Sequence, residues 1–155
     1  MGDRRPRLFF PGAATFAQVL VQVSPDGRWI AYGSNESGRF EVYVQSFPTP
    51  GGKWQISKDG GYHPKWRTDG KELFYYAADG QLMTVAIAGD SALETGTAVP
   101  LFKARLLNGP TPAVGFRAQY DVASDGQRFL LNVPLEETQA STITVVVNWT
   151  AALRK

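Results

Sequence analysis

Hydrophobic and polar positions follow one another in short runs along the chain, and turn-forming residues separate the runs. Residues 29–32, Trp-Ile-Ala-Tyr, form a compact apolar run, and residues 41–45, Glu-Val-Tyr-Val-Gln, alternate around Tyr43. Runs of this length, rich in aromatic and β-branched residues and bounded by Gly, Pro, Asn or Asp, favour strands over helices. The pattern therefore predicts an all-β chain of short antiparallel strands.

Three segments repeat the same residue order around an Asp-Gly turn. They read SPDGRWIAY (residues 24–32), RTDGKELFY (67–75) and ASDGQRFLL (123–131). In the first, Pro25 suits the second position of a type I turn, and the Asp26 side chain can hydrogen-bond to nearby backbone. We interpret the three turn acids Asp26, Asp69 and Asp125 as turn formers that lie far apart, not as metal ligands.

The repeats divide the chain into three units, over residues 16–57, 62–103 and 116–149 of one domain. Strands are expected at residues 29–32, 41–45 and 53–57, then at 64–67, 72–77, 81–87 and 98–102, then at 117–123, 128–133 and 142–149. The third unit lacks a fourth strand. The segment PRLFF at residues 6–10 is similar to VPLF at 99–102, so the chain opens with an extra fourth strand.

The repeat length predicts a β-propeller built of four-stranded antiparallel blades. Asp26 and Asp69 are 43 residues apart, within the ~40–45 residues of such a blade. One chain holds three blades' worth of strands, whereas natural propellers need roughly four to eight blades to close a ring. We therefore expect a homodimer that forms one six-bladed propeller, in which residues 6–10 of each chain complete the third blade of the other.

The repeats resemble those of a known group of propellers. Residues 23–47 and 64–76 are similar to the propeller repeats of TolB-type proteins, which also occur in prolyl oligopeptidase-like proteins. GGKWQIS, YDVASDGQRFLLNVP and ITVVVNW resemble C-terminal propeller regions of bacterial serine/threonine kinases and related sensor-like proteins. Membership of that group would imply a periplasmic or extracytoplasmic location, although the N-terminus lacks the apolar core of a signal peptide. Kinase and peptidase activities do not follow, because the motifs that carry them are absent from the sequence.

Composition narrows the classes of partner. The formal net charge of +2 is too small to indicate nucleic acid, and the small cluster of Arg4, Arg5 and Arg7 reads as a solvated flank. No apolar run approaches the ~18 residues of a membrane span. The sequence has no cysteine and one histidine, so we expect no metal, no cofactor and no disulfide.

Polar residues of the predicted loops are the best candidates for a site. In propellers, loops that join fourth to first strands and second to third strands share the face around the central channel. The candidates on this rim are Asn35, Glu36, Arg39, Tyr62, His63, Arg105 and Arg117. We predict a non-catalytic module that binds a protein or small ligand there, with no catalytic residue assigned. The alternative is a propeller hydrolase, or a gating propeller fragment of a larger hydrolase, in which His63 would be the first residue to test.

Overall fold

The computed structural model describes residues 9, 17–89, 92–110, 118–134 and 144–146. Within these residues every regular element is a strand. The strands are β1 (Gln18–Val23), β2 (Trp29–Ser34), β3 (Glu41–Ser46), β4 (Lys53–Gln55), β5 (Gly61–Trp66), β6 (Glu72–Ala77), β7 (Gln81–Ala88), β8 (Glu94–Thr95), β9 (Val99–Lys103), β10 (Tyr120–Val122), β11 (Phe129–Leu131) and β12 (Thr144–Val146). The prediction of an all-β chain is confirmed.

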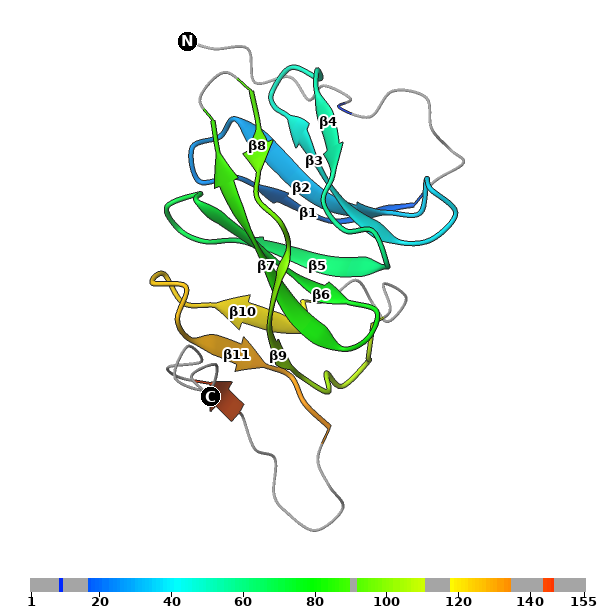
Figure 1. The fold of residues 1–155 in the computed structure, drawn as a ribbon, viewed down its shortest axis with the longest axis vertical. Helices are drawn as coiled ribbons and strands as arrows, with labels where there is room; N and C mark the ends of the chain where they lie inside the picture. The colour runs from blue at the N-terminus through cyan, green and yellow to red at the C-terminus, as the bar shows by residue number, and fades with distance from the viewer. Residues whose placement is uncertain (1–8, 10–16, 90–91, 111–117, 135–143, 147–155) are drawn as a thin grey trace.

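The strands form three antiparallel sheets that follow one another along the long axis of the molecule (Figure 1). The first sheet has the order β1-β2-β3-β4, and the third has the order β10-β11-β12. In the second sheet β5, β6 and β7 are neighbours, and β7 pairs with both β8 and β9. In the described part of the chain the third sheet therefore has one strand fewer than the first.

Several strand bounds differ from expectation, and one strand was not predicted. Strand β5 begins three residues before the predicted position 64, and β10 and β11 are shorter than the predicted strands at 117–123 and 128–133. The fourth strand of the first sheet ends at Gln55, two residues before the predicted end. Strand β8 was not predicted; it forms because β7 extends to Ala88 and Gly89 turns the chain back, so that Thr95 pairs with Ile87. Gly89 has a φ of 94°, a conformation that side chains other than glycine rarely adopt.

The three Asp-Gly turns have the same geometry. In each turn the glycine N–H donates to the carbonyl three residues earlier at 2.9 Å: Gly27 to Ser24, Gly70 to Arg67 and Gly126 to Ala123. The turns of successive sheets also touch, since a Cβ added at Gly70 would lie 3.7 Å from Pro25 Cδ and one at Gly126 would lie 2.7 Å from Arg67 Cδ. The expectation that the turn acids lie far apart is wrong for Asp26 and Asp69, which line one pocket of about 280 Å³.

Two apolar cores lie between the sheets, because the central strands bury side chains on both faces. The core between the first and second sheets contains Trp29, Ala31, Val42, Val44, Ile56, Leu73, Tyr75, Val85, Ile87 and Leu93. The core between the second and third sheets contains Phe74, Tyr76, Leu82, Leu101, Ala104, Leu106, Tyr120, Phe129 and Leu131. Successive residues of β6 thus contribute to opposite cores, as the period-two geometry of a strand requires.

The first strands of the first two sheets, β1 and β5, carry matching bulges. The register of β1 shifts between Val19 and Gln22, and that of β5 shifts between Tyr62 and Lys65. Leu20 and His63 occupy the bulges, each with a φ of 55°. Positive φ is uncommon outside glycine, so the repetition of this conformation shows that the bulge is part of the repeat.

Candidate functional site

A groove of about 680 Å³ lies between the first and second sheets. Its floor includes a row of side chains across the second sheet, in which Tyr75 of β6 pairs with Met83 of β7 and Met83 pairs with Pro100 of β9. The remaining lining residues are Gln55, Ile56, Lys58, Asp59, Gly60, Ala77, Asp79, Gln81, Thr95, Gly96, Thr97 and Ala98. On the side of the first sheet, Gln55 at the end of β4 and Ile56 after it line the groove.

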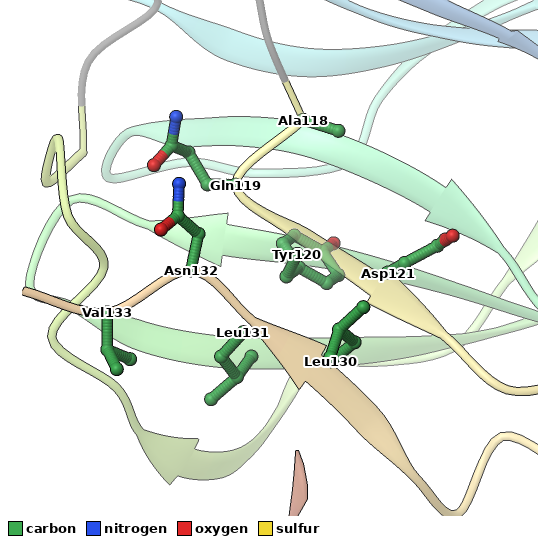
Figure 2. A pocket seen from close by; sticks show the side chains of 8 residues that line it. All are labelled: Ala118, Gln119, Tyr120, Asp121, Leu130, Leu131, Asn132 and Val133. Carbon is green, nitrogen blue, oxygen red and sulfur yellow. The ribbon is translucent and has the colours of Figure 1, made fainter. Parts of the chain in front are cut away.

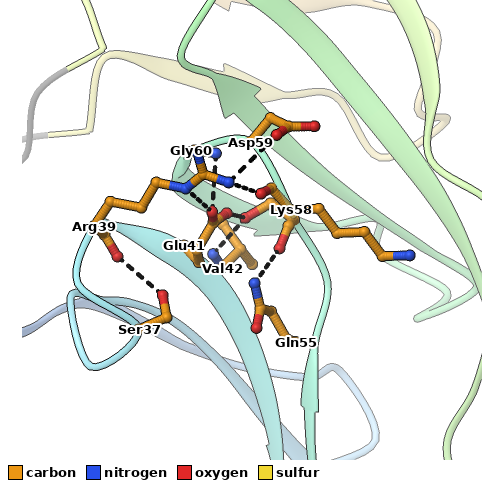
Figure 3. A network of polar contacts seen from close by, with 9 residues as sticks. Ser37, Arg39, Glu41, Val42, Gln55, Lys58, Asp59 and Gly60 are labelled. Atoms are coloured by element: carbon orange, nitrogen blue, oxygen red, sulfur yellow. Dashed lines mark hydrogen bonds and ion pairs between the residues drawn. The ribbon is translucent and has the colours of Figure 1, made fainter.

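The connection from the first to the second sheet forms one wall, and a buried carboxylate holds it in place (Figure 3). Glu41, the first residue of β3, is 1% exposed. Its Oε1 accepts hydrogen bonds from Arg39 Nε at 2.6 Å and from the Gly60 N–H at 3.0 Å. The Ser57 hydroxyl donates to Oε2 and accepts from the Val42 N–H at 2.8 Å. The carboxylate thus joins the start of β3 to residues on both sides of Lys58 and Asp59.

Arg39 completes this wall from the outside. Its Nη2 donates to the backbone carbonyl of Lys58 and lies 3.3 Å from Asp59 Oδ1. The guanidinium is more than half exposed, whereas the carboxylate of Glu41 is not. The pair therefore fixes the backbone at the end of the groove and leaves the side chains of Lys58 and Asp59 exposed.

Tyr75 places a hydroxyl group on the floor of the groove. The residue is 4% exposed, and its hydroxyl makes no hydrogen bond within the described part of the chain. Burial raises the pKa of Tyr75 to about 12, and the negative charges of Glu41, Asp79 and Asp59 add to the effect. The hydroxyl is therefore protonated at neutral pH and can donate to a group in the groove.

Of the predicted rim residues, Arg39 contributes to the groove and two others bind elsewhere in the first sheet. Asn35 Oδ1 accepts a hydrogen bond from the Ala17 N–H at 2.8 Å. Glu36 Oε1 lies 2.6 Å from Lys53 Nζ. The side chains of Asn35 and Glu36 are therefore bound to other residues of the same chain.

The other predicted rim residues do not gather at the groove. Tyr62 is half-buried against Phe40, with 6.1 Å between the ring centroids. His63 is 4% exposed, and its carbonyl accepts a hydrogen bond from the Tyr120 hydroxyl at 2.7 Å. Arg105 is exposed, and Arg117 lies outside the described residues. His63 is thus a buried residue of the bulge in β5.

Sequence analysis did not single out Glu41, Tyr75 or Asp79. Asp79 stands before Gly80, and an Asp-Gly pair between two strands favours a hairpin turn. Asp79 does fulfil that role, because its carboxylate accepts hydrogen bonds from the Gln81 N–H at 3.0 Å and from Gln81 Nε2 at 3.2 Å. Nothing in the local sequence shows that the same side chain lines the groove.

A second hollow, of about 410 Å³, lies on the third sheet (Figure 2). Its lining residues are Ala118, Gln119, Tyr120, Asp121, Leu130, Leu131, Asn132 and Val133. They come from β10, β11 and the residues that flank these two strands. Leu130 is 48% exposed there, which marks this hollow as an uncovered apolar surface of the last sheet.

The described residues contain no group of three His, Asp or Glu side chains that could hold a metal ion. Among the same residues, no helix is long and apolar enough to cross a membrane.

Comparisons with known proteins bear on the fold. No protein-family model matches the sequence, and no curated protein matches it. An oligogalacturonate lyase from Vibrio parahaemolyticus has a similar structure, with a TM-score of 0.50 and 14% identity over 77% of this chain and 31% of the lyase. TolB from Acinetobacter baumannii matches with a TM-score of 0.40 and 16% identity, over 85% of this chain and 41% of TolB.

The likeness to the lyase confirms the predicted β-propeller fold, since that protein is a β-propeller. At this identity the likeness concerns the fold and not the activity. The chain spans less than half the length of either similar protein. The resemblance to kinase-type sensor regions, the six-bladed ring and the homodimer stay predictions.

Proposed function

We propose that this chain is a non-catalytic β-propeller module that binds a ligand in the groove between its first two sheets. The observation that carries the proposal is the groove itself, whose volume of about 680 Å³ falls within the ~300–1,000 Å³ typical of ligand sites. Its floor holds apolar side chains such as Met83 and Ala98, but polar groups make up more of its lining than apolar ones, so hydrogen bonds and charge would carry much of the binding. The Glu41 network supports the proposal because it holds one wall before any ligand arrives, which lowers the entropic cost of binding.

Blocking the groove tests this function. Thr97 is exposed and lines the groove, so Thr97→Trp places an indole in it without disturbing a core. Thr49→Trp adds the same side chain at an exposed loop position that does not line the groove. In NMR titrations with a library of soluble fragments, binders should shift the amides of Gly60 and Gln81 in the wild type and in Thr49→Trp, but not in Thr97→Trp. Fragments that bind all three proteins equally, or none, would contradict the proposal.

The hydrolase alternative is tested by turnover. Ester, lactone and peptide substrates should remain uncleaved by the wild-type protein. Cleavage that His63→Ala abolished, with the fold intact by circular dichroism, would establish an enzyme instead. The burial of His63 supports the non-catalytic reading, because a general base must reach its substrate.

We also propose that two chains assemble into one six-bladed propeller, each contributing blades over residues 16–57, 62–103 and 116–149. The third sheet supports this, because in the described chain it has three strands and leaves Leu130 48% exposed. On the outer face of the first sheet, Ile30, Tyr32 and Tyr43 form a third apolar cluster next to Phe47, and these three residues are already buried within one chain. Phe9, the described residue of the predicted N-terminal strand, lies against Phe47 with 5.3 Å between ring centroids. In the proposed dimer, the third sheet of the partner would pack on this face, and residues 6–10 would complete that sheet beside Thr144–Val146.

Light scattering tests the assembly. The wild type should have twice the mass of one chain, and deletion of residues 1–10 should yield monomers or a much weaker dimer. Leu130→Glu places a charge on the uncovered face of the third sheet and should have the same effect. Val99→Glu is the matched control, since Val99 is equally exposed, at 50%, on β9 of the middle sheet. A wild-type monomer at micromolar concentration, unchanged by the deletion, would refute the dimer.

A further inference from the structure

The groove between the first two sheets carries an excess of negative charge, which indicates the class of its ligand. Its charged lining residues are Lys58, Asp59 and Asp79, so two carboxylates face one ammonium group. The backbones beside the two acids meet at one end of the groove, where the Ala78 N–H donates to the Gly60 carbonyl at 3.3 Å. Asp59 and Asp79 therefore flank a single contact between the linker and the β6–β7 turn.

These two acids differ from most others in the described chain, because no close cation neutralises them fully. Asp79 accepts hydrogen bonds only from Gln81 and forms no ion pair within the described residues. Asp59 meets Arg39 at 3.3 Å, but its side chain is 99% exposed, so that pair contributes little. By contrast, the turn acid Asp69 lies 2.6 Å from Arg67 Nη2.

The Tyr75 hydroxyl is a second, independent indication of a ligand. It belongs to a residue that is only 4% exposed, this residue lines the same groove, and no described residue forms a hydrogen bond with the hydroxyl. The charges of Asp59 and Asp79 both act on this hydroxyl, so the buried tyrosine and the two acids share one environment. Met83 and Ala98 continue the apolar floor from there.

We propose that the ligand of this groove carries a guanidinium or ammonium group, as an arginine or lysine side chain does, and that this group binds between Asp59 and Asp79 beside the Tyr75 hydroxyl. The carboxylates accept its N–H groups, and the floor of Met83 and Ala98 covers its methylene stem, the arrangement that long cationic side chains favour. A lysine cannot accept a hydrogen bond, so the tyrosine hydroxyl then donates to a carbonyl of the ligand backbone. This inference rests on the proposed function and adds the chemistry of the ligand.

An isosteric pair of ligands isolates the charge. N-acetylarginine amide and N-acetylcitrulline amide have nearly the same shape, but only the first is cationic. Titration of the ¹⁵N-labelled full-length protein should show the arginine compound shifting the amides of Gly60, Asp79 and Gln81. The citrulline compound should bind about fivefold more weakly or worse, as expected for the loss of one partly exposed charge pair. Higher ionic strength should weaken the arginine compound and leave the citrulline compound unchanged.

Variants locate the site. Asp79→Asn removes the charge but keeps the oxygen that accepts the Gln81 N–H, and it should weaken arginine binding about fivefold. Asp121→Asn is the control, because that acid is exposed on β10 and does not line the groove. Tyr75→Phe should weaken both the arginine and citrulline compounds, since it removes a donor and no charge.

The outcomes separate the two proposals. Equal binding of both compounds, or arginine binding that Asp79→Asn leaves unchanged, would overturn the cationic ligand. Fragments that bind the groove while N-acetylarginine amide does not would also overturn it, yet they would leave the binding function intact. If no compound of any charge shifts the groove amides, both the ligand class and the proposed function are wrong.

Discussion

Removing the carboxylate of Glu41 should destabilise the protein far more than removing that of Glu36. Both acids lie 2.6 Å from a cationic nitrogen, of Arg39 and Lys53 respectively. Glu41 is 1% exposed and joins β3 to the connection between the first two sheets, whereas Glu36 is 17% exposed and its partner Lys53 45% exposed. The two ion pairs have the same length but should contribute differently to stability. Comparing Glu41→Ala with Glu36→Ala shows how much of the contribution comes from burial and not from distance.

The magnitude follows from the groups that lose their acceptor. In Glu41→Ala the buried Ser57 hydroxyl and the buried Gly60 N–H are left without it, at about 1–3 kcal/mol each. Arg39 is more than half exposed, so water solvates its guanidinium and it adds no comparable penalty. We expect a loss of about 3 kcal/mol in the free energy of unfolding, against ~0–1 kcal/mol for the exposed pair in Glu36→Ala.

Urea unfolding followed by tryptophan fluorescence measures both values at one protein concentration, because association would change apparent stability. Glu41→Gln serves as a milder variant in case the alanine variant does not fold. It retains the oxygen that accepts from Arg39 and Gly60, so it should lose about 1 kcal/mol. If Glu41→Ala and Glu36→Ala differ by less than ~1 kcal/mol, the reasoning about the buried carboxylate is refuted.

Three further substitutions test the description of the turns and cores. Tyr76→Phe should lower the free energy of unfolding by about 1–3 kcal/mol in urea, because the buried Ala104 carbonyl loses its donor at 2.7 Å. Tyr75→Phe is the control, since it breaks no such bond. An equal or smaller loss in Tyr76→Phe than in this control would contradict the prediction. Hydrogen bonding from Arg67 lowers the pKa of Asp69 from 3.8 to about 2. The ionised Asp69 therefore stabilises the folded protein fully above pH ~4, and this contribution is lost as the pH falls towards 2. Thermal melts of Asp69→Asn should therefore converge with those of the wild type in acid, and a constant gap across pH would contradict the assignment. Trp66→Ala should lower the free energy of unfolding by about 3 kcal/mol, since the half-buried indole packs on the first core and donates to the Gln22 carbonyl at 3.2 Å. A loss under ~1 kcal/mol would show that this contact is dispensable.

Strands and turns were predictable because local sequence determines them. The Asp-Gly turns need a carboxylate near its own backbone and a glycine with positive φ, and both requirements are met within four residues. Gly27, Gly70 and Gly126 have φ values of 71°, 73° and 70°, so one sequence signal repeats as one conformation. The order of strands in each sheet then follows from short connections.

The groove was not predictable from the sequence, because its parts are brought together by tertiary contacts. Glu41 looks like an ordinary polar residue of an alternating strand, and only the return of the chain at Gly60 buries it. The loop residues Asn35, Glu36 and Arg39 are close in sequence, yet only Arg39 turns towards the linker. The bulge at Leu20 lacks a sequence signal, because leucine rarely adopts positive φ, and a histidine such as His63 adopts it more often but still uncommonly.

The pairing of strands in chain order has a consequence for how the molecule folds and opens. Because β1 to β4 and β10 to β12 pair strictly with their successors, each sheet can form hairpin by hairpin from neighbouring segments of the chain. Side-chain contacts over long separations, such as Trp66 with Gln22 and Tyr120 with His63, join these units only after each has formed. Amide hydrogen exchange should therefore be slowest in the doubly covered strands β6 and β7 and fastest in the three-residue strands of the third sheet, so that opening starts at that end of the stack.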